Sequence, residues 1–203
     1  MSSTIEAQPI GGSVDSTVKQ HSAFGPGQPD MWFLVLFDSL VYACYLISYV
    51  VFRMRDPEQF LESQRHLNQG LGVLNTILLL TSSVLVARCV QSTRKGDYGQ
   101  ARREVALAAL FGLSFMAVKI YEWTAAIDAG FTLTHSLFFG YYYFITGFHM
   151  IHMVIGMVVL FIANYNLNRP GESTLYTVET CGTYWHMVDF LWVFIFSLLY
   201  VMR

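Results

Sequence analysis

The chain has 203 residues, of which 54% are hydrophobic, 16% aromatic and only 13% charged. Soluble domains usually carry about 25% charged residues, so this composition indicates a membrane protein. The formal net charge of −2 excludes a general electrostatic attraction to nucleic acid, and we expect no nucleic-acid partner. The three cysteines form no C-x-x-C pair, and we interpret them as small packing residues.

The chain divides into a polar amino-terminal part and an apolar remainder. Residues 1–28 are rich in Ser, Gly, Gln and Pro, and they lack the apolar core of a signal peptide. We interpret them as a mobile polar tail before one membrane domain, residues 29–203. That domain contains five apolar segments of the length that crosses a bilayer. They cover residues 31–52, 71–90, 105–127, 138–163 and 182–201. The sequence predicts an all-α integral membrane protein, a five-transmembrane-helix bundle.

Basic residues in the connections predict how the bundle is oriented, because cytoplasmic loops carry more Lys and Arg. One end collects Lys19, Arg94, Lys95, Arg102, Arg103 and Arg169, and the other has Arg53, Arg55, Arg65 and Arg203. The connection 128–136 has no Lys or Arg, as is typical of an outer loop. We therefore expect the amino terminus inside and the carboxyl terminus outside, in the inner (plasma) membrane of a cell.

Ionisable side chains occur inside the apolar segments, where each costs about 2.5–3.5 kcal/mol on insertion scales and normally faces protein. Three pairs are three residues apart and so share a helix face: His149 with His152, Lys119 with Glu122, and His186 with Asp189. Asp38 has no partner in its own segment, so another helix must supply one.

Depth along each helix, at about 1.5 Å per residue, sorts these groups into two layers. Glu122 lies near the outer end of its segment, beside its ion-pair candidate Lys119, and the spacing leaves open whether that pair is structural or functional. The inner layer contains Asp38, His149, His152, His186 and Asp189. Imidazole and carboxylate groups can bind Zn or Fe, but this spacing matches no metal motif. We expect no metal ligands and no catalytic residues in this chain.

Two motifs resemble those of a known family. Residues 146–156 read TGFHMIHMVIG and are similar to the T-G-[FL]-H-x-x-H-x-x-x-G signature of subunit III of haem–copper oxidases. Residues 184–192 read YWHMVDFLW and resemble that family's Y-W-H-x-V-D-x-x-W segment. Weaker matches occur at residues 32–38, at residues 74–83 and around Tyr121-Glu122-Trp123. Asp38 stands where the family usually has Glu, and Lys119 where a neutral Gln is frequent. Residues 141–149 (YYYFITGFH) and 184–200 (YWHMVDFLWVFIFSLLY) look closest to the five-helix nitric-oxide-reductase activation branch.

The resemblance implies a non-catalytic accessory subunit with no cofactor of its own, whose partner subunits carry haem and copper. Such a subunit stabilises the catalytic subunit, supports proton uptake and aerobic electron transport, and binds lipid between its helices. The residues implied as an interior polar network or lipid site are Asp38, Glu122, His149, His152, His186 and Asp189. The alternatives are an activation protein of nitric oxide reductase, a self-contained membrane metalloenzyme and a small transporter.

Overall fold

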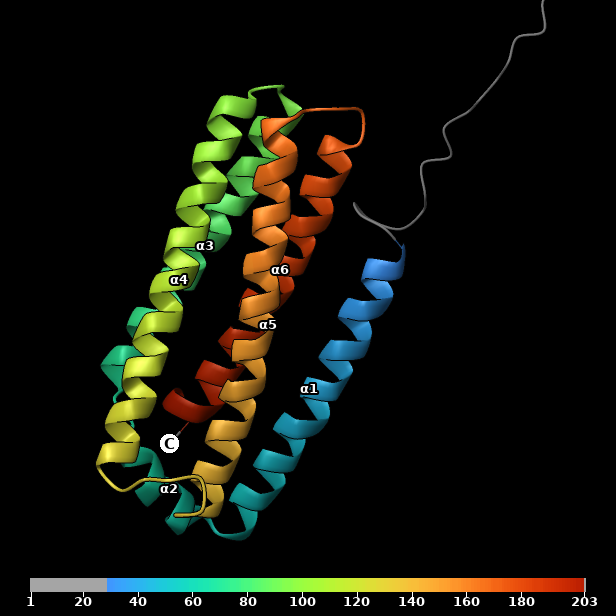
Figure 1. The fold of residues 1–203 in the computed structure, drawn as a ribbon. Coiled ribbons are helices and arrows are strands. Elements are labelled where there is room, and N and C mark those ends of the chain that lie inside the picture. Colours follow the sequence, from blue (N-terminus) through green and yellow to red (C-terminus); the bar gives the residue numbers. More distant parts are fainter. Residues whose placement is uncertain (1–28, 203) are drawn as a thin grey trace, which may run out of the picture.

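The computed structural model describes residues 29–202, and the proposed tail, residues 1–28, lies outside the described part. The described chain is mostly helical, with five helices long and apolar enough to cross a membrane (Figure 1). The prediction of an all-α, five-span bundle is confirmed. The elements in order are α1 (Pro29–Arg55), α2 (Pro57–Arg65), α3 (Gln69–Arg94), α4 (Tyr98–Asp128), α5 (Leu137–Asn168), α6 (Thr174–Phe196) and a terminal π-helix η1 (Ser197–Val201).

The helices extend beyond the predicted apolar segments, which corrects several expected boundaries. The third span begins at Tyr98 and the last at Thr174, both in stretches expected to be polar connections. The connection after the first span also contains a helix of its own, α2. Hydropathy marks the part of a helix that faces hydrocarbon, and a helix continues into the interfacial region until a capping residue ends it.

Polar side chains cap most helix starts. Asp56 accepts a hydrogen bond from the Gln59 N–H at the start of α2, and Asp97 accepts one from Gln100 N–H at the start of α4. Asn68 Oδ1 accepts from two N–H groups of the first turn of α3. Such contacts satisfy N–H groups that have no partner within the helix. The turns after α3 and α4 use Gly96 and Gly130, whose positive φ angles of 78° and 88° favour glycine.

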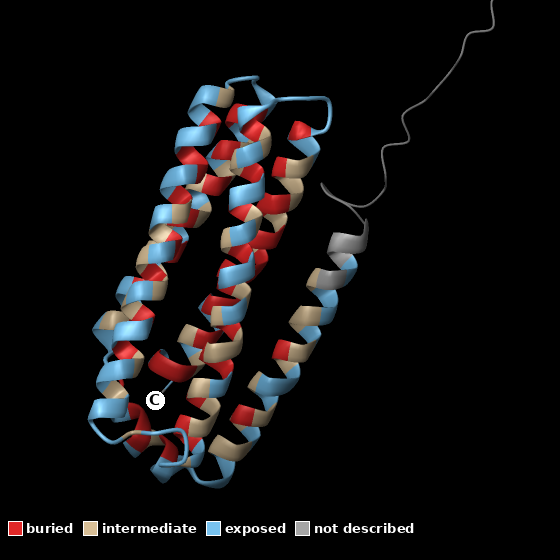
Figure 2. Cartoon of the chain, in the orientation of Figure 1, coloured by how far each residue is buried: buried red, intermediate tan, exposed pale blue. Residues whose placement is uncertain are grey.

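Successive long helices run in opposite directions along the bundle (Figure 1). The helix α4 packs against α3 and α5, and α6 packs against α3, α5 and α1. Burial differs strongly between helices (Figure 2). In the span Thr174–Val201, 56% of the most apolar stretch is buried, against 11% of that stretch in the span Val35–Arg55 of α1. The helix α6 is therefore the centre of the bundle, and α1 lies at its edge.

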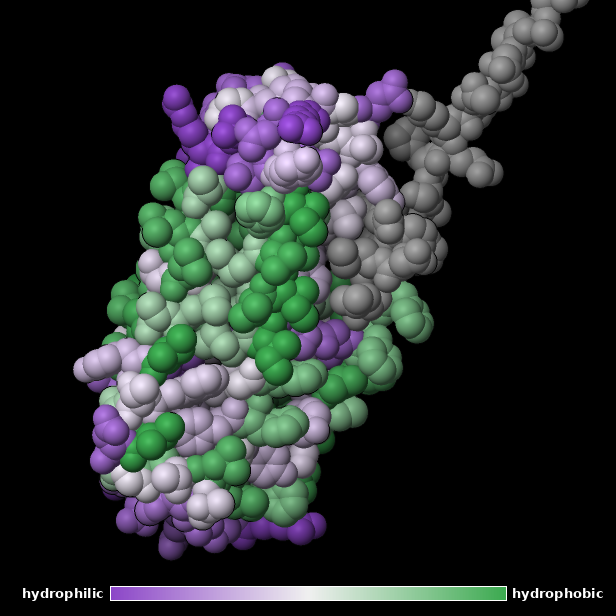
Figure 3. Space-filling view, viewed as in Figure 1, coloured by the Kyte–Doolittle hydropathy of each residue, from purple (hydrophilic) through white to green (hydrophobic). Residues whose placement is uncertain are grey.

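The outer surface fits a bilayer. On the face drawn in Figure 3, hydrophobic residues gather in the middle and hydrophilic residues gather at the two ends. Exposed side chains of α1 include Leu36, Leu40 and Ile47, each more than 60% accessible. A soluble monomer rarely exposes apolar surface on this scale, because water penalises it. The chain is a multi-pass membrane protein.

The short helix α2 covers one end of the bundle, next to the carboxyl end of the chain (Figure 1). Its Phe60 is buried and packs edge-on against Tyr49 of α1 and Phe138 of α5. Its Gln64 is buried as well and reaches the terminal π-helix. This helix therefore joins α1, α5 and η1 at a single end.

Candidate functional site

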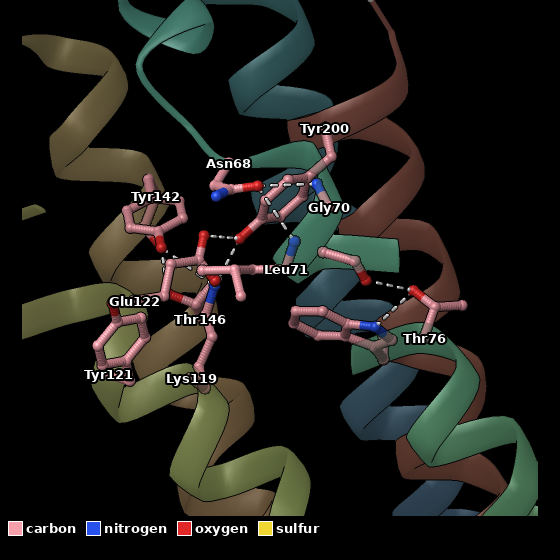
Figure 4. Close-up of polar contacts among 12 residues, drawn as sticks. Asn68, Gly70, Leu71, Thr76, Lys119, Tyr121, Glu122, Tyr142, Thr146 and Tyr200 are labelled. Atoms are coloured by element: carbon pink, nitrogen blue, oxygen red, sulfur yellow. Dashed lines mark hydrogen bonds and ion pairs between the residues drawn. The ribbon is translucent and has the colours of Figure 1, made fainter. Parts of the chain in front are cut away.

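Lys119 of α4 is at the centre of a buried polar network (Figure 4). Its side chain is 1% exposed, and its Nζ lies 3.1 Å from Glu122 Oε2, 3.1 Å from the Tyr142 hydroxyl and 2.7 Å from the Tyr200 hydroxyl. An ammonium group has three donors, so these contacts use all of them. The Tyr200 hydroxyl donates to Glu122 Oε1 at 2.5 Å. Both carboxylate oxygens are therefore bonded, and the ion pair leaves no uncompensated buried charge.

Aromatic rings enclose the same ammonium group. Its Nζ lies 4.6 Å from the ring centroid of Tyr142, 5.2 Å from that of Tyr200 and 5.4 Å from that of Trp192. Ring faces carry negative partial charge and attract cations, most strongly where water is absent. The rings therefore add to the stabilisation that Glu122 provides.

The carboxyl-terminal π-helix brings Tyr200 into this network, and three other helices hold it there. Gln64 Nε2 donates to the Leu199 carbonyl and Gln69 Nε2 to the Tyr200 carbonyl, each at 2.8 Å. The Tyr49 hydroxyl donates to the Leu198 carbonyl at 3.5 Å. The last carbonyls of a helix have no partner within it, so side chains must supply the donors. Here α1, α2 and α3 supply them.

A second polar contact joins α1 to α5. His152 Nε2 lies 3.1 Å from Asp38 Oδ1, and its Nδ1 lies 2.9 Å from the Phe148 carbonyl. The carbonyl can only accept, so Nδ1 carries a proton. The contact with Asp38 then needs a second proton, held either by Nε2 or by the carboxyl group. Both side chains are about one-eighth exposed.

A third polar group lies between α3 and α6. Ser83 Oγ is 2.7 Å from His186 Nδ1, and Asp189 Oδ2 is 3.9 Å from the same nitrogen. The His186 side chain is 42% exposed, whereas that of Asp189 is 6% exposed. Among the described residues, neither oxygen of Asp189 has a hydrogen-bond partner.

His149 is enclosed by rings instead of polar groups. It is 1% exposed, edge-on to Phe115 and tilted against Trp192 at a centroid distance of 5.4 Å. Neither ring nitrogen has a hydrogen-bond partner within residues 29–202. Its environment is therefore that of a packed aromatic residue.

Comparison with known proteins identifies the family. Residues 61–203, more than half of the chain, match the family model described as cytochrome c oxidase subunit III. The chain belongs to the cytochrome c oxidase subunit III family. The recognition made from the two histidine motifs is confirmed, and so is the role that follows from it, a non-catalytic subunit III of a haem–copper oxidase.

Relatives extend the similarity beyond the family model. The chain is 27% identical to cytochrome c oxidase subunit 3 of Synechocystis, over 98% of this chain and 88% of that protein. It is 26% identical to the subunit 3 of Thermostichus vulcanus, over 100% and 98%. It is also 30% identical to a haem–copper oxidase subunit I+III of Aeropyrum pernix, over 65% of this chain and 17% of that longer protein.

The polar groups predicted for one inner layer of this subunit III separate into distinct contacts. The structure brings Asp38 to His152, so these two lie at the same level of the bundle, and it brings His186 to Asp189. His149 joins neither pair, since its ring turns into the aromatic core. Lys119 and Glu122 hydrogen-bond none of them and lie next to the terminal π-helix, although Lys119 and His149 both contact Trp192. Spacing within a helix fixes the face of a residue, but not which neighbouring helix the face meets.

Sequence reasoning missed the hydroxyl partners and one further ion cluster. Contacts to the ionisable groups come from Tyr142, Tyr200 and Ser83. Each is a hydroxyl within an apolar segment, and Ser83 also ends the weakly matching stretch 74–83. Glu104 of α4 was also missed, although it is 5% exposed. It accepts from Ser92 Oγ at 2.8 Å and pairs with Arg88 Nε at 3.2 Å.

No group of three or more His, Cys, Asp or Glu side chains has the geometry to hold a metal ion in the part of the chain that the structure describes. Its polar contacts instead join helices: α1 to α5, α3 to α6, and α4 to α5 and η1. Contacts of this kind fix how helices assemble in a membrane.

Proposed function

We propose that this subunit III stands beside the catalytic subunit of a haem–copper oxidase and preserves that subunit's activity during turnover. The haem and copper belong to the partner subunits, and this chain contributes no cofactor. The observation that carries the proposal is the Aeropyrum pernix relative, whose name joins subunits I and III in one chain. Two parts fused in one protein act at close range, which favours direct contact between the separate subunits as well.

The α1 edge of the bundle supports two further parts of the proposal. Tyr45, Gly140, Tyr141 and Phe144 line an apolar groove of about 260 Å³ between α1 and α5. An acyl chain fits such a surface, so we assign lipid binding to this edge. The Asp38–His152 pair lies on the same two helices and holds an exchangeable proton. We assign the support of proton uptake to this pair.

The membrane and the partner complete the proposal. We place the subunit in the inner (plasma) membrane with its amino terminus inside, because the basic residues favour that end. A nitric oxide reductase is the alternative partner, suggested by the five spans. The relatives described above are named for cytochrome c oxidase or haem–copper oxidase, so they favour an oxidase.

The test compares wild-type and Asp38→Asn complexes, purified through a tag on the catalytic subunit. We expect the wild-type chain to co-purify with a haem-bearing subunit. The Asp38→Asn complex should keep its haem spectrum and its initial rate of oxygen consumption, because the redox centres lie in another chain. Its activity should decay severalfold faster during turnover, since α1 loses a charge-assisted hydrogen bond worth about 1.5–3 kcal/mol.

Cys44→Ser is the matched control, because it changes polarity at an exposed position of α1. This variant should decay like the wild type. Immediate loss of the initial rate in an intact Asp38→Asn complex would contradict the accessory role and indicate chemistry at Asp38 itself. Co-purification with a haem-free protein would contradict the oxidase partner.

A further inference from the structure

A groove lined by both apolar and polar side chains lies on the surface between α3 and α6. It measures about 240 Å³ and is lined by Ala87 and Arg94 of α3 and by Glu179, Thr183 and His186 of α6, among others. At one end Arg94 is held by Glu179, with Nη2 and Nε at 2.8 Å and 2.9 Å from one carboxylate oxygen. At the other end stands His186.

His186 is in an unusual position for a surface that faces lipid. It lies near the middle of the span Thr174–Val201, yet its side chain is 42% exposed. A polar side chain at that depth normally faces protein, because hydrocarbon offers it no hydrogen bonds. Ser83 uses one ring nitrogen, Nδ1, and no residue of the described chain bonds the other. The exposure therefore indicates that another protein covers this face.

Asp189 lies one turn along α6 from His186, but it is not among the residues that line the groove. It is 5% exposed, its Oδ2 lies 3.9 Å from His186 Nδ1, and within the described chain neither of its oxygens has a hydrogen-bond partner. A buried carboxyl group without a donor is costly. The ring of His186, in contrast, reaches the groove, and only its Nδ1 is bonded within the described chain. The groove therefore favours an occupant that carries a hydrogen-bonding side chain.

We propose that the groove between α3 and α6 receives a transmembrane helix of the catalytic subunit, which presents a hydrogen-bonding side chain to Nε2 of His186. This inference rests on the proposed function and names the surface through which it acts. The small side chains Ala87 and Thr183 allow a helix to approach closely, as at other helix contacts in membranes.

A lipid fits the groove less well than a helix. Headgroups lie about 15 Å from the bilayer centre, so they do not reach His186, and acyl chains carry no donors. The cation nearest the interface, Arg94, is already paired with Glu179 and offers a phosphate no free charge. The occupant that satisfies His186 at mid-span is thus a protein side chain.

The test places a photo-cross-linking amino acid at Ala87 or Thr183 in the complete oxidase, purified from native membrane. The control position is Leu113 of α4, which is 52% exposed and at the middle of its helix. We expect Ala87 and Thr183 to cross-link to the haem-bearing subunit, with at least a tenfold lower yield from Leu113. Cross-links from the groove to lipid, to a second copy or to another small subunit would overturn the inference.

A second measurement uses His186→Leu and its conservative counterpart His186→Gln. Membrane helix contacts lose roughly three- to tenfold in affinity with one hydrogen bond, so the His186→Leu chain should wash off the complex three- to tenfold faster. His186→Gln should be retained better, and Leu113→Ala should match the wild type. Equal retention of His186→Leu and wild type would overturn the inference while the proposed function stood. Absence of a haem-bearing subunit from the wild-type preparation would instead overturn the proposed function.

Discussion

Lys119 illustrates how this fold keeps a full charge inside a membrane bundle. A lone ammonium would be expelled or neutralised there, since hydrocarbon and a dry protein core both penalise charge. Glu122 supplies the opposite charge from one turn along the same helix, and two tyrosine hydroxyls complete the donors and acceptors. The buried ion pair is therefore stable only when all of its partners are present. Removing one charge should destabilise the fold more than neutralising both charges together.

Lys119→Met should therefore destabilise the folded subunit by about 3–5 kcal/mol, because Glu122 is left buried with only the Tyr200 hydroxyl. The double variant Lys119→Met/Glu122→Gln should recover most of that loss, since a neutral amide replaces the unpaired carboxylate. The measurement is denaturant unfolding of the purified subunit in detergent, and Lys95→Met outside the span is the control, expected within about 0.5 kcal/mol of wild type. A double variant as unstable as the single one would show that Lys119 acts through packing and not through charge.

At the residue scale, the Lys119–Glu122 pair could be predicted from the sequence, but the tyrosine hydroxyls that complete its hydrogen bonds could not. The spacing of three indicated that Lys119 and Glu122 share a face, and they lie 3.1 Å apart. No spacing rule relates them to Tyr142 or Tyr200, which come from other elements 23 and 81 residues along the chain from Lys119. Those contacts depend on how α5 and η1 pack, which is a property of the assembled bundle.

At the scale of helices, the packing of α4, α5 and α6 depends on one tryptophan between two glycines. Trp185 of α6 is fully buried. A Cβ atom built on Gly112 of α4 would lie 2.8 Å from its ring, and one built on Gly156 of α5 would lie 2.9 Å from it. Both approaches are closer than side chains tolerate. The glycines therefore allow the indole to fill the space where the three helices meet.

Gly156→Ala should destabilise the subunit by about 1–3 kcal/mol, since a buried ring cannot move aside without disturbing its neighbours. Gly147→Ala on the same helix is the matched control, because nothing lies within 4 Å of a Cβ there. It should be neutral or stabilise by up to about 1 kcal/mol, as alanine favours a helix over glycine. Thermal unfolding of both variants in one detergent measures the difference. Equal effects at the two positions would mean that helix propensity, and not contact with Trp185, sets the outcome.

Helix existence could be read from the sequence, whereas helix length could not. Apolar runs mark all five spans, because the bilayer requires them. The additional turns at Tyr98 and Thr174, and the whole of α2, are polar enough to resemble loops. Their caps and their contacts with other elements keep them helical, as when Gln64 of α2 bonds the terminal π-helix.

At the scale of the whole molecule, the two ends of the bundle differ in their basic residues. The end with the α3–α4 turn and the α5–α6 connection carries Arg94, Lys95, Arg102, Arg103 and Arg169. The opposite end includes α2, and its turn between α4 and α5 contains no Lys or Arg from residue 129 to residue 136. Because basic loops stay in the cytoplasm, this asymmetry predicts that the α3–α4 turn is inside and the α4–α5 turn outside.

Single cysteines in these two turns test the orientation, after Cys44, Cys89 and Cys181 are replaced by serine or alanine. Leu133→Cys lies in the α4–α5 turn, where Leu133 is 59% exposed, and should react with a membrane-impermeant maleimide in intact cells. Lys95→Cys lies in the α3–α4 turn and should react only after the membrane is opened. Each cysteine serves as the other's control, since both occupy exposed turns and differ only in side. The reverse pattern would invert the topology, and it would move the Asp38–His152 pair from the inner half of the membrane to the outer half, which would remove the basis for assigning it to proton uptake from the cytoplasm.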